Sequence, residues 1–143
     1  MSFSGLLIFQ LLFKQLNQQR RSFFDPGMPP IGADLAGLVD ASINAVRPIG
    51  SCEELAGCHM TVGLSNFSVQ LPPKTASGEP IKTPLESAYL TLTNPFGMDY
   101  VIGNPKKNYR RLEANHPALV TVEDIMKLEG FDRLIRIQEY YTS

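Results

Sequence analysis

Three short apolar runs along the chain have the composition of buried parallel strands. They lie at residues 22–24, 59–64 and 99–102, and aromatic or β-branched residues are frequent in them. Successive runs are about 38 residues apart, which leaves room for the crossover helix that a pair of parallel strands requires. The pattern therefore predicts successive βα units.

Helical patterns follow each of these runs. Asp34 is predicted to cap a helix with an apolar stripe that Pro48 and Gly50 end. Thr83 is predicted to cap a second helix, with a proline at its first helical position. Thr121 is predicted to open a third, which stops at Gly130. Together these elements predict an α/β fold built on a parallel sheet.

Residues 1–22 are predicted to form a separate unit, with residues 23–143 as the main domain. Residues 3–13 are strongly apolar, but this run is shorter than the ~20 residues that a membrane-spanning helix requires. The basic residues follow the run instead of preceding it, which is not the order of a signal peptide. We interpret the unit as an apolar or amphipathic helix that packs on a neighbouring element. A helix lying on a membrane surface is the alternative.

Length and composition restrict the class of protein further. The chain has 143 residues, of which 43% are hydrophobic and 19% charged, so it suits one folded domain. A complete eight-stranded α/β barrel needs roughly 200 to 250 residues, so this chain cannot form one alone. The net charge of -1 argues against binding to nucleic acid. Cys52 and Cys58 do not have zinc-site spacing. We expect a cytoplasmic protein without a protein-bound metal.

Polar residues follow each predicted strand, at the edge of the sheet where α/β folds place their chemistry. Asp25 comes directly after the first strand, Ser65 and Asn66 follow the second, and Asn104 follows the third. Consecutive right-handed βαβ units would bring these strand ends together. Asp before proline is also a common turn former. A purely structural role therefore stays open for Asp25, and the same holds for Asn66.

The residues around these strand ends resemble a known family. The segments are Phe-Phe-Asp-Pro-Gly at 23–27, Gly-Leu-Ser-Asn-Phe-Ser at 63–68 and Gly-Met-Asp-Tyr-Val-Ile at 97–102. In this order and spacing they resemble the sixth, seventh and eighth strands of the pterin-binding domain, which dihydropteroate synthase shares with the methyltetrahydrofolate:corrinoid methyltransferases. The resemblance implies that residues 23–143 form a partial TIM-type (β/α)8 barrel, about its last three βα units.

Two departures separate the branches of this family. Dihydropteroate synthases typically carry Arg and Lys after the seventh strand and an Arg-x-His after the eighth. This chain has Asn66 and Phe67 at the first place, and Gly103 followed by Asn104 at the second. Both departures favour the methyltransferase branch, and a dihydropteroate synthase relative is the lower alternative.

The resemblance implies transfer of a methyl group from N5 of methyltetrahydrofolate to the cobalt of a corrinoid. Methyltetrahydrofolate would be the donor, and cobalamin or another corrinoid on a partner protein would be the acceptor. Asp25 would accept hydrogen bonds from the donor edge of the pterin. Asn66 would be the catalytic residue that hydrogen-bonds N5 as the C–N bond breaks. Ser65 and Asn104 would complete the pterin contacts.

The absence of the first five strands leaves other interpretations open. An open three-stranded sheet exposes two edges, which single chains avoid. The chain is therefore predicted to form a homo-oligomer or to pair with a complementing chain. Alternatively, it is a non-catalytic α/β remnant or structural subunit. His59 and Asp99 precede or begin their strands, and both are predicted to be structural.

Overall fold

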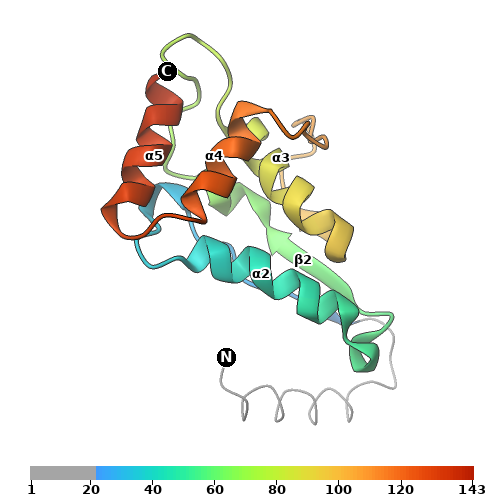
Figure 1. Cartoon of the computed structure of the whole chain (residues 1–143). Helices are drawn as coiled ribbons and strands as arrows, with labels where there is room; N and C mark the ends of the chain where they lie inside the picture. Colours follow the sequence, from blue (N-terminus) through green and yellow to red (C-terminus); the bar gives the residue numbers. More distant parts are fainter. Residues whose placement is uncertain (1–21) are drawn as a thin grey trace.

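The computed structural model describes residues 22–143, and its sheet confirms the predicted parallel arrangement. The strands β1 (Phe23–Phe24), β2 (His59–Gly63) and β3 (Met98–Ile102) pair in the order β1-β2-β3, and both pairs are parallel. A helix follows β1, β2 and β3 in turn, so the described chain has an α/β fold (Figure 1). The predicted N-terminal helix lies outside the described residues.

Helices pack against one face of this sheet. They are α2 (Leu38–Ser51), α3 (Lys82–Thr93), α4 (Pro117–Ile125) and α5 (Phe131–Thr142), with 3-10 turns η1 (Ile31–Ala33), η2 (Glu53–Leu55), η3 (Leu64–Ser68) and η4 (Asn94–Phe96). In Figure 1, α2 runs along the sheet, while α3, α4 and α5 gather toward one end of the molecule. Helix α4 lies between the other two, because it packs on both α3 and α5.

The predicted cap, Asp34, lies before the cap position, which Gly37 occupies, but its side chain does bind the first turn of α2. Its carboxylate accepts hydrogen bonds from the backbone N–H groups of Leu38 (2.9 Å) and Val39 (2.8 Å), which have no partners inside the helix. The helix does not stop at Pro48, which lies inside it; α2 ends at Ser51, directly after Gly50. Pro48 is exposed, so water can satisfy the carbonyl group that a proline leaves without a donor.

The cap predicted for α3 is also wrong. The helix begins at Lys82 with Ile81 at the cap position, so Thr83 lies inside the first turn and makes no capping hydrogen bond. Ile81 is fully buried in the core. Burial of this side chain therefore sets the start of the helix, and the polar capping pattern around Thr83 does not.

Helix α4 begins earlier and ends earlier than the sequence pattern predicts. His116 caps it, since Nδ1 accepts a hydrogen bond from the N–H of Ala118 at 3.2 Å. A proline at the first helical position supports this start, and Thr121 is buried inside the helix. Gly130 does not end α4; it precedes α5 and has a φ of 55°, which suits glycine.

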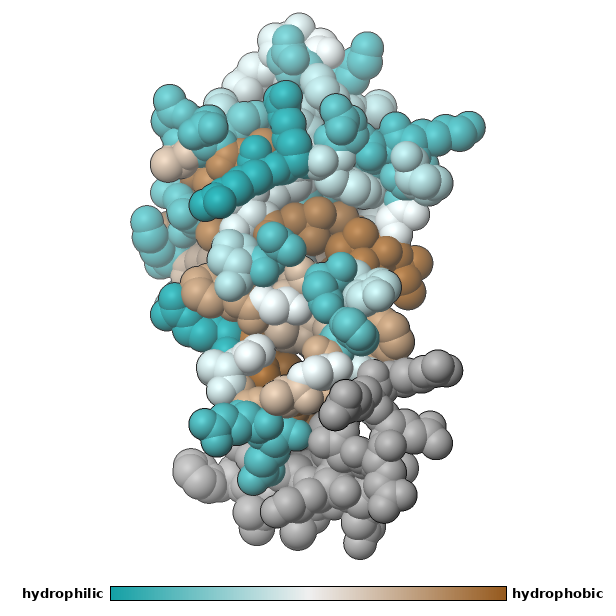
Figure 2. Space-filling model, turned by 90° about the vertical axis from the view of Figure 1, so that its right-hand side faces the viewer, coloured by the Kyte–Doolittle hydropathy of each residue, from teal (hydrophilic) through white to brown (hydrophobic). Residues whose placement is uncertain are grey.

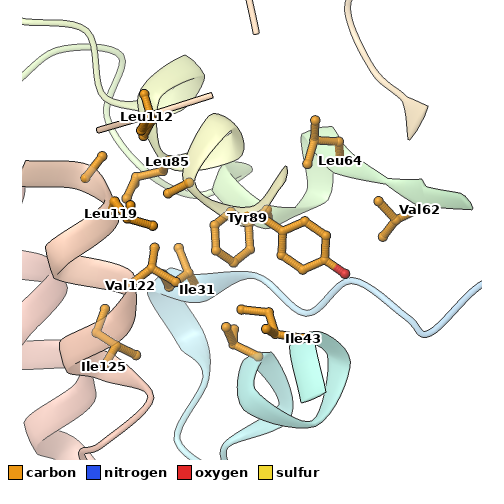
Figure 3. Packing of buried hydrophobic residues seen from close by; sticks show 14 of the residues in the cluster. Ile31, Ile43, Val62, Leu64, Leu85, Tyr89, Leu112, Leu119, Val122 and Ile125 are labelled. Carbon is orange, nitrogen blue, oxygen red and sulfur yellow. The ribbon is translucent and has the colours of Figure 1, made fainter. Parts of the chain in front are cut away.

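The hydrophobic core lies between the helices and the covered face of the sheet. On β2, Met60 and Val62 are buried and alternate with half-buried residues, the pattern of a strand covered mainly on one side. Figure 3 labels buried side chains from the whole described chain, namely Ile31, Ile43, Val62, Leu64, Leu85, Tyr89, Leu112, Leu119, Val122 and Ile125. The core therefore joins all the helices to the central strand.

The other face of the sheet, and the edge at β3, are open to solvent. Only Met98 of β3 is buried, whereas Tyr100 is 50% exposed and Ile102 is 70% exposed. On β1, Phe23 is 53% exposed. Figure 2 shows hydrophobic residues gathered across the middle of one side of the molecule. The parallel α/β arrangement is thus established, and the partial barrel stays a prediction.

A buried ion cluster fastens α5 to the start of α2. The guanidinium group of Arg133, a residue 1% exposed, donates to the carboxylates of Asp34 and Asp40 at 2.7–3.0 Å and to the carbonyl of Leu128 at 3.0 Å. Burial raises the pKa of Asp34, but two backbone N–H groups and Arg133 outweigh it and hold this pKa below its ordinary value. The cluster therefore joins the two ends of the described chain with ionised groups.

Candidate functional site

The turn after β1 is shaped by the side chain of Asp25. Its Oδ1 accepts a hydrogen bond from the backbone N–H of Gly27 at 2.8 Å, and Gly27 has a φ of 85°, which suits glycine. The turn-forming role that the sequence left open for Asp25 is therefore confirmed. The residue is exposed, and within residues 22–143 its Oδ2 accepts no hydrogen bond. One oxygen of this carboxylate can still accept donors from a ligand.

Two helices hold this turn from the inside. The hydroxyl of Ser42, on α2, donates to the carbonyl of Gly27 at 2.6 Å and lies 2.9 Å from the hydroxyl of Tyr89, on α3. Burial raises the pKa of Tyr89; the hydrogen bond with Ser42 partly offsets this rise, and the nearby charge of Asp25 adds to it. The position of Asp25 is therefore coupled to the core and does not depend on its own turn alone.

Asn66 links the second strand end to the first. It lies in η3, directly after β2, and its Nδ2 donates a hydrogen bond to the backbone carbonyl of Met28. A carbonyl only accepts, so this contact fixes which end of the amide faces Met28. An NH₂ group carries two hydrogens, so one N–H and the Oδ1 of Asn66 stay available on an exposed residue.

The anchoring of η3 explains why Ser65 and Asn66 face outward. Leu64 and Phe67, on either side of them, are both fully buried, and the ring of Phe67 packs 5.5 Å from that of Tyr89. Ser65 and Asn66 are exposed. The structure therefore brings both residues to the same strand-end surface as the Asp25 turn.

Asn104 is held within its own loop. Its side-chain oxygen accepts a hydrogen bond from the N–H of Lys106 at 2.9 Å, and its own N–H donates to the hydroxyl of Tyr109 at 3.3 Å. Across the described part of the chain, Asn104 has no hydrogen bond to Asp25 or Asn66. The predicted site is thus assembled from two strand ends, with the third beside them but not bonded to them.

A buried carboxylate under the strand ends was not predicted from the sequence. Glu86, on α3, is fully buried and accepts hydrogen bonds from Ser68 at 2.6 Å and from Lys107 at 2.7 and 2.9 Å. Burial raises the pKa of Tyr109, and the charge of Glu86 raises it further. A glutamate in a helix is usually exposed, so the only sequence signal was its place beside the apolar stripe of α3.

His59 and Asp99 form a pair at the opposite, amino end of the sheet, as predicted for structural residues. The Nδ1 of His59 lies 2.6 Å from Asp99, whose other oxygen accepts the N–H of Met60 at 2.9 Å. The His59 ring contacts Phe23 and Tyr100, with ring centres 5.3 and 4.8 Å away. These contacts tie the three strands together on the open face.

Two cavities of the described chain lie away from the predicted site residues. One of about 460 Å³ is lined by Asp40, Arg133 and the turn before α5, and one of about 290 Å³ lies between α3 and the edge of β3. None of Asp25, Ser65, Asn66 and Asn104 lines either cavity. These four residues therefore form part of an open surface.

Residues 22–143 contain no cluster of three or more His, Cys, Asp or Glu side chains that could hold a metal ion. Within the same range, no helix combines the length and apolar character needed to cross a membrane. Cys52 and Cys58 are free thiols.

No family model, curated protein or solved structure matches the chain.

The pterin-binding interpretation therefore rests on the residues at the strand ends and on the arrangement of those ends. The loops of Asp25 and Asn66 are joined directly, through the hydrogen bond between Asn66 and Met28.

Proposed function

We propose that this chain is a fragment or subunit of a pterin-dependent methyltransferase that moves a methyl group from N5 of methyltetrahydrofolate to the cobalt of a corrinoid. The observation that supports the proposal best is the contact between Asn66 and the carbonyl of Met28. It presents one amide N–H and one amide oxygen at the surface, next to the turn that carries Asp25. A donor and a carboxylate side by side match a reduced pterin, which offers both acceptors and donors.

Each site residue has a separate task in this proposal. Asp25 accepts hydrogen bonds from the pterin edge through its second carboxylate oxygen. Asn66 would donate its remaining N–H to N5, to which the electron pair of the breaking N–CH₃ bond returns, and a proton from solvent would complete tetrahydrofolate. Ser65 contacts the pterin through its backbone, and Asn104 closes the site from the third strand end. A Co(I) corrinoid held by a partner protein supplies the nucleophile that takes the methyl group.

We also propose that the chain either pairs with a complementing chain that supplies the missing strands or forms a homo-oligomer through its open edge. The exposed edge of β3 and the open face of the sheet support this, because sheet edges pair readily with other strands. The missing wall of the pocket would come from the complementing chain. Free thiols at Cys52 and Cys58 suit the reducing cytoplasm, which is where we place the protein.

A non-catalytic α/β subunit is the second candidate function. Asp25 and Asn104 each form hydrogen bonds within their own turns, and the cavities described above lie elsewhere; both facts favour a structural role for these residues. The third, lower candidate, a relative of dihydropteroate synthase, is disfavoured by Asn66 and Phe67, which stand where cationic groups would be expected.

Loss of the Co(I) cobalamin absorbance on addition of methyltetrahydrofolate tests turnover directly. We expect the wild-type chain to accelerate this loss and Asn66→Ala to slow it on the order of 100-fold, the usual cost of removing one transition-state donor. Asn44→Ala, an exposed asparagine on α2, is the matched control and should leave the rate unchanged. A folded wild-type chain without acceleration would favour the non-catalytic subunit.

A further inference from the structure

Glu86 connects two of the strand-end loops from below. Its two partners come from different loops: Ser68 is the last residue of η3, which carries Asn66, and Lys107 follows Asn104 in the loop after β3. Both oxygens of the carboxylate are used, since Oε1 accepts from Ser68 and Lys107 and Oε2 accepts from Lys107. One buried group thus holds both loops.

The connection extends to Asn104 itself. The hydroxyl of Tyr109 accepts the N–H of Asn104, and this ring lies against Gly103, where an added Cβ would be 2.9 Å from the hydroxyl. Tyr109 also lies close enough to Glu86 for the carboxylate to affect its pKa. The loop after β3 is therefore held at two points, by Lys107 and by Tyr109, on the same side as Glu86.

Stability alone does not account for this arrangement. Removing a carboxylate from water is costly, and apolar residues of similar size often replace a buried ion pair without loss of stability. The side chain of Glu86 is 0% exposed and that of Lys107 is 22% exposed, so the pair carries this cost. A leucine would extend the apolar stripe of α3. A leucine could not hydrogen-bond the two polar loops, whereas Glu86 fixes their relative geometry.

We propose that Glu86 is a positioning residue, which holds η3 and the loop after β3 in one arrangement so that Asn66 and Asn104 address the same pterin. The identity of the ligand in this inference rests on the proposed function. The clamp between the two loops does not, so the two parts are tested separately.

Hydrogen exchange of the full chain, read by mass spectrometry, tests the clamp. Glu86→Gln keeps an acceptor for Ser68 but removes the charge that holds Lys107. We expect faster exchange in residues 103–110, with a smaller change in residues 64–71, whose bond through Ser68 is kept, and none in α5. Asp124→Asn, which removes the half-exposed ion pair with Arg136, is the control and should alter neither loop. Unchanged exchange in both loops of Glu86→Gln would overturn the clamp.

Two variants that each remove only one partner of Glu86 keep the test decisive if Glu86→Gln fails to fold. Ser68→Ala removes only the bond to η3, and Lys107→Gln removes only the bond to the other loop. We expect the first to loosen residues 64–71 and the second to loosen residues 103–110. Equal loosening of the whole chain by both variants would show a general structural role and would contradict the proposal.

Calorimetric titration with methyltetrahydrofolate tests the link to the ligand. We expect Glu86→Gln to raise the dissociation constant for methyltetrahydrofolate about 10-fold at a temperature at which the variant is fully folded. Equal affinity of the two proteins would overturn the positioning role even if exchange changes. If the wild type itself does not bind, the proposed function fails, whereas the exchange result still decides whether Glu86 clamps the loops.

Discussion

The amide of Asn66 shows how much the structure adds to a residue that the sequence had already suggested. The sequence predicted a polar residue at a strand end, because the apolar run before it is distinct. It did not predict that one amide hydrogen would be used on Met28, since that depends on the path of a loop far away in the chain. The same holds for Asp25: one carboxylate oxygen accepts the N–H of Gly27 within its turn, and the other is available to a ligand.

Acid sensitivity is expected from Asp34. Its pKa in the folded protein lies below its ordinary value of 3.8, so the ionised group stabilises the fold above that pH. This contribution is lost as the pH falls from about 4 through the lower folded pKa. We expect Asp34→Asn to reduce the free energy of unfolding at pH 7 by about 3 kcal/mol, because it leaves a buried pair incomplete.

Urea unfolding between pH 7 and pH 3 measures this effect. The Asn variant should lose less stability than the wild type over the acidic part of that range. Asp132→Asn, on the exposed side of α5, is the control and should behave as the wild type does. A variant as acid-sensitive as the wild type would show that Asp34 is not the group responsible.

Thr121 is expected to limit stability. It is 1% exposed, and its hydroxyl is the one buried side-chain polar atom in residues 22–143 without a hydrogen-bond partner. Thr121→Val removes this unsatisfied group while keeping the shape, so we expect a gain of about 1 kcal/mol in the free energy of unfolding.

Thr91→Val is the matched control for this change. The hydroxyl of Thr91 donates to the carbonyl of Ser87 and accepts the N–H of Leu112, so its loss should destabilise the protein by about 1 kcal/mol. Thermal unfolding of both variants checks the pair of predictions. Equal effects of the same sign would contradict the account of Thr121.

The order and type of the elements were predictable, but several of their ends were not. Apolar periodicity and strand composition are local, and they indicated the parallel sheet and a helix after each strand, but not that two helices, α4 and α5, follow β3. The end of α2 beyond Pro48 and the start of α3 at Lys82 depend on solvent exposure and on burial of Ile81. These are tertiary effects that a capping pattern does not contain. Glu86 was missed for the same reason, since its burial depends on two distant loops.

The close contact between α2 and η4 is expected to leave no room for a side chain at Gly50. A Cβ built on Gly50 would lie 1.9 Å from the carbonyl oxygen of Phe96. We expect Gly50→Ala to destabilise the protein by about 2 kcal/mol, because backbone must move to relieve the overlap. Gly63→Ala meets no heavy atom within 4 Å and should change stability by less than about 0.5 kcal/mol. Chemical denaturation measures the free energy of unfolding of both variants. An unchanged stability of Gly50→Ala would contradict the close approach of the two backbones.

At the scale of the molecule, the length of the chain and the open sheet lead to the same conclusion. A chain of 143 residues is too short to close an eight-stranded barrel, and the structure leaves one face of its sheet and the β3 edge exposed. The sequence predicted open sheet edges from the three strands that the resemblance assigns, taken together with the length of the chain. It did not predict which residues would be exposed, because that depends on the register between β2 and β3.

Self-association through β3 is therefore expected. Ile102 is 70% exposed at the end of this edge strand, and a charge there opposes pairing with another strand. We expect Ile102→Lys to shift the purified chain toward monomer in sedimentation velocity, while Ile135→Lys, at an exposed site on α5, does not. A wild-type chain that is monomeric at all concentrations would contradict this expectation.

Calorimetric titration of the folded chain with methyltetrahydrofolate tests the central claim most directly. We expect the wild type to bind, and Asn66→Ala and Asp25→Ala each to weaken the affinity about 10-fold, which corresponds to one lost hydrogen bond of ordinary strength. Asn44→Ala should bind as the wild type does. Absence of binding by the well-folded wild type, or binding that neither site variant changes, would contradict the account.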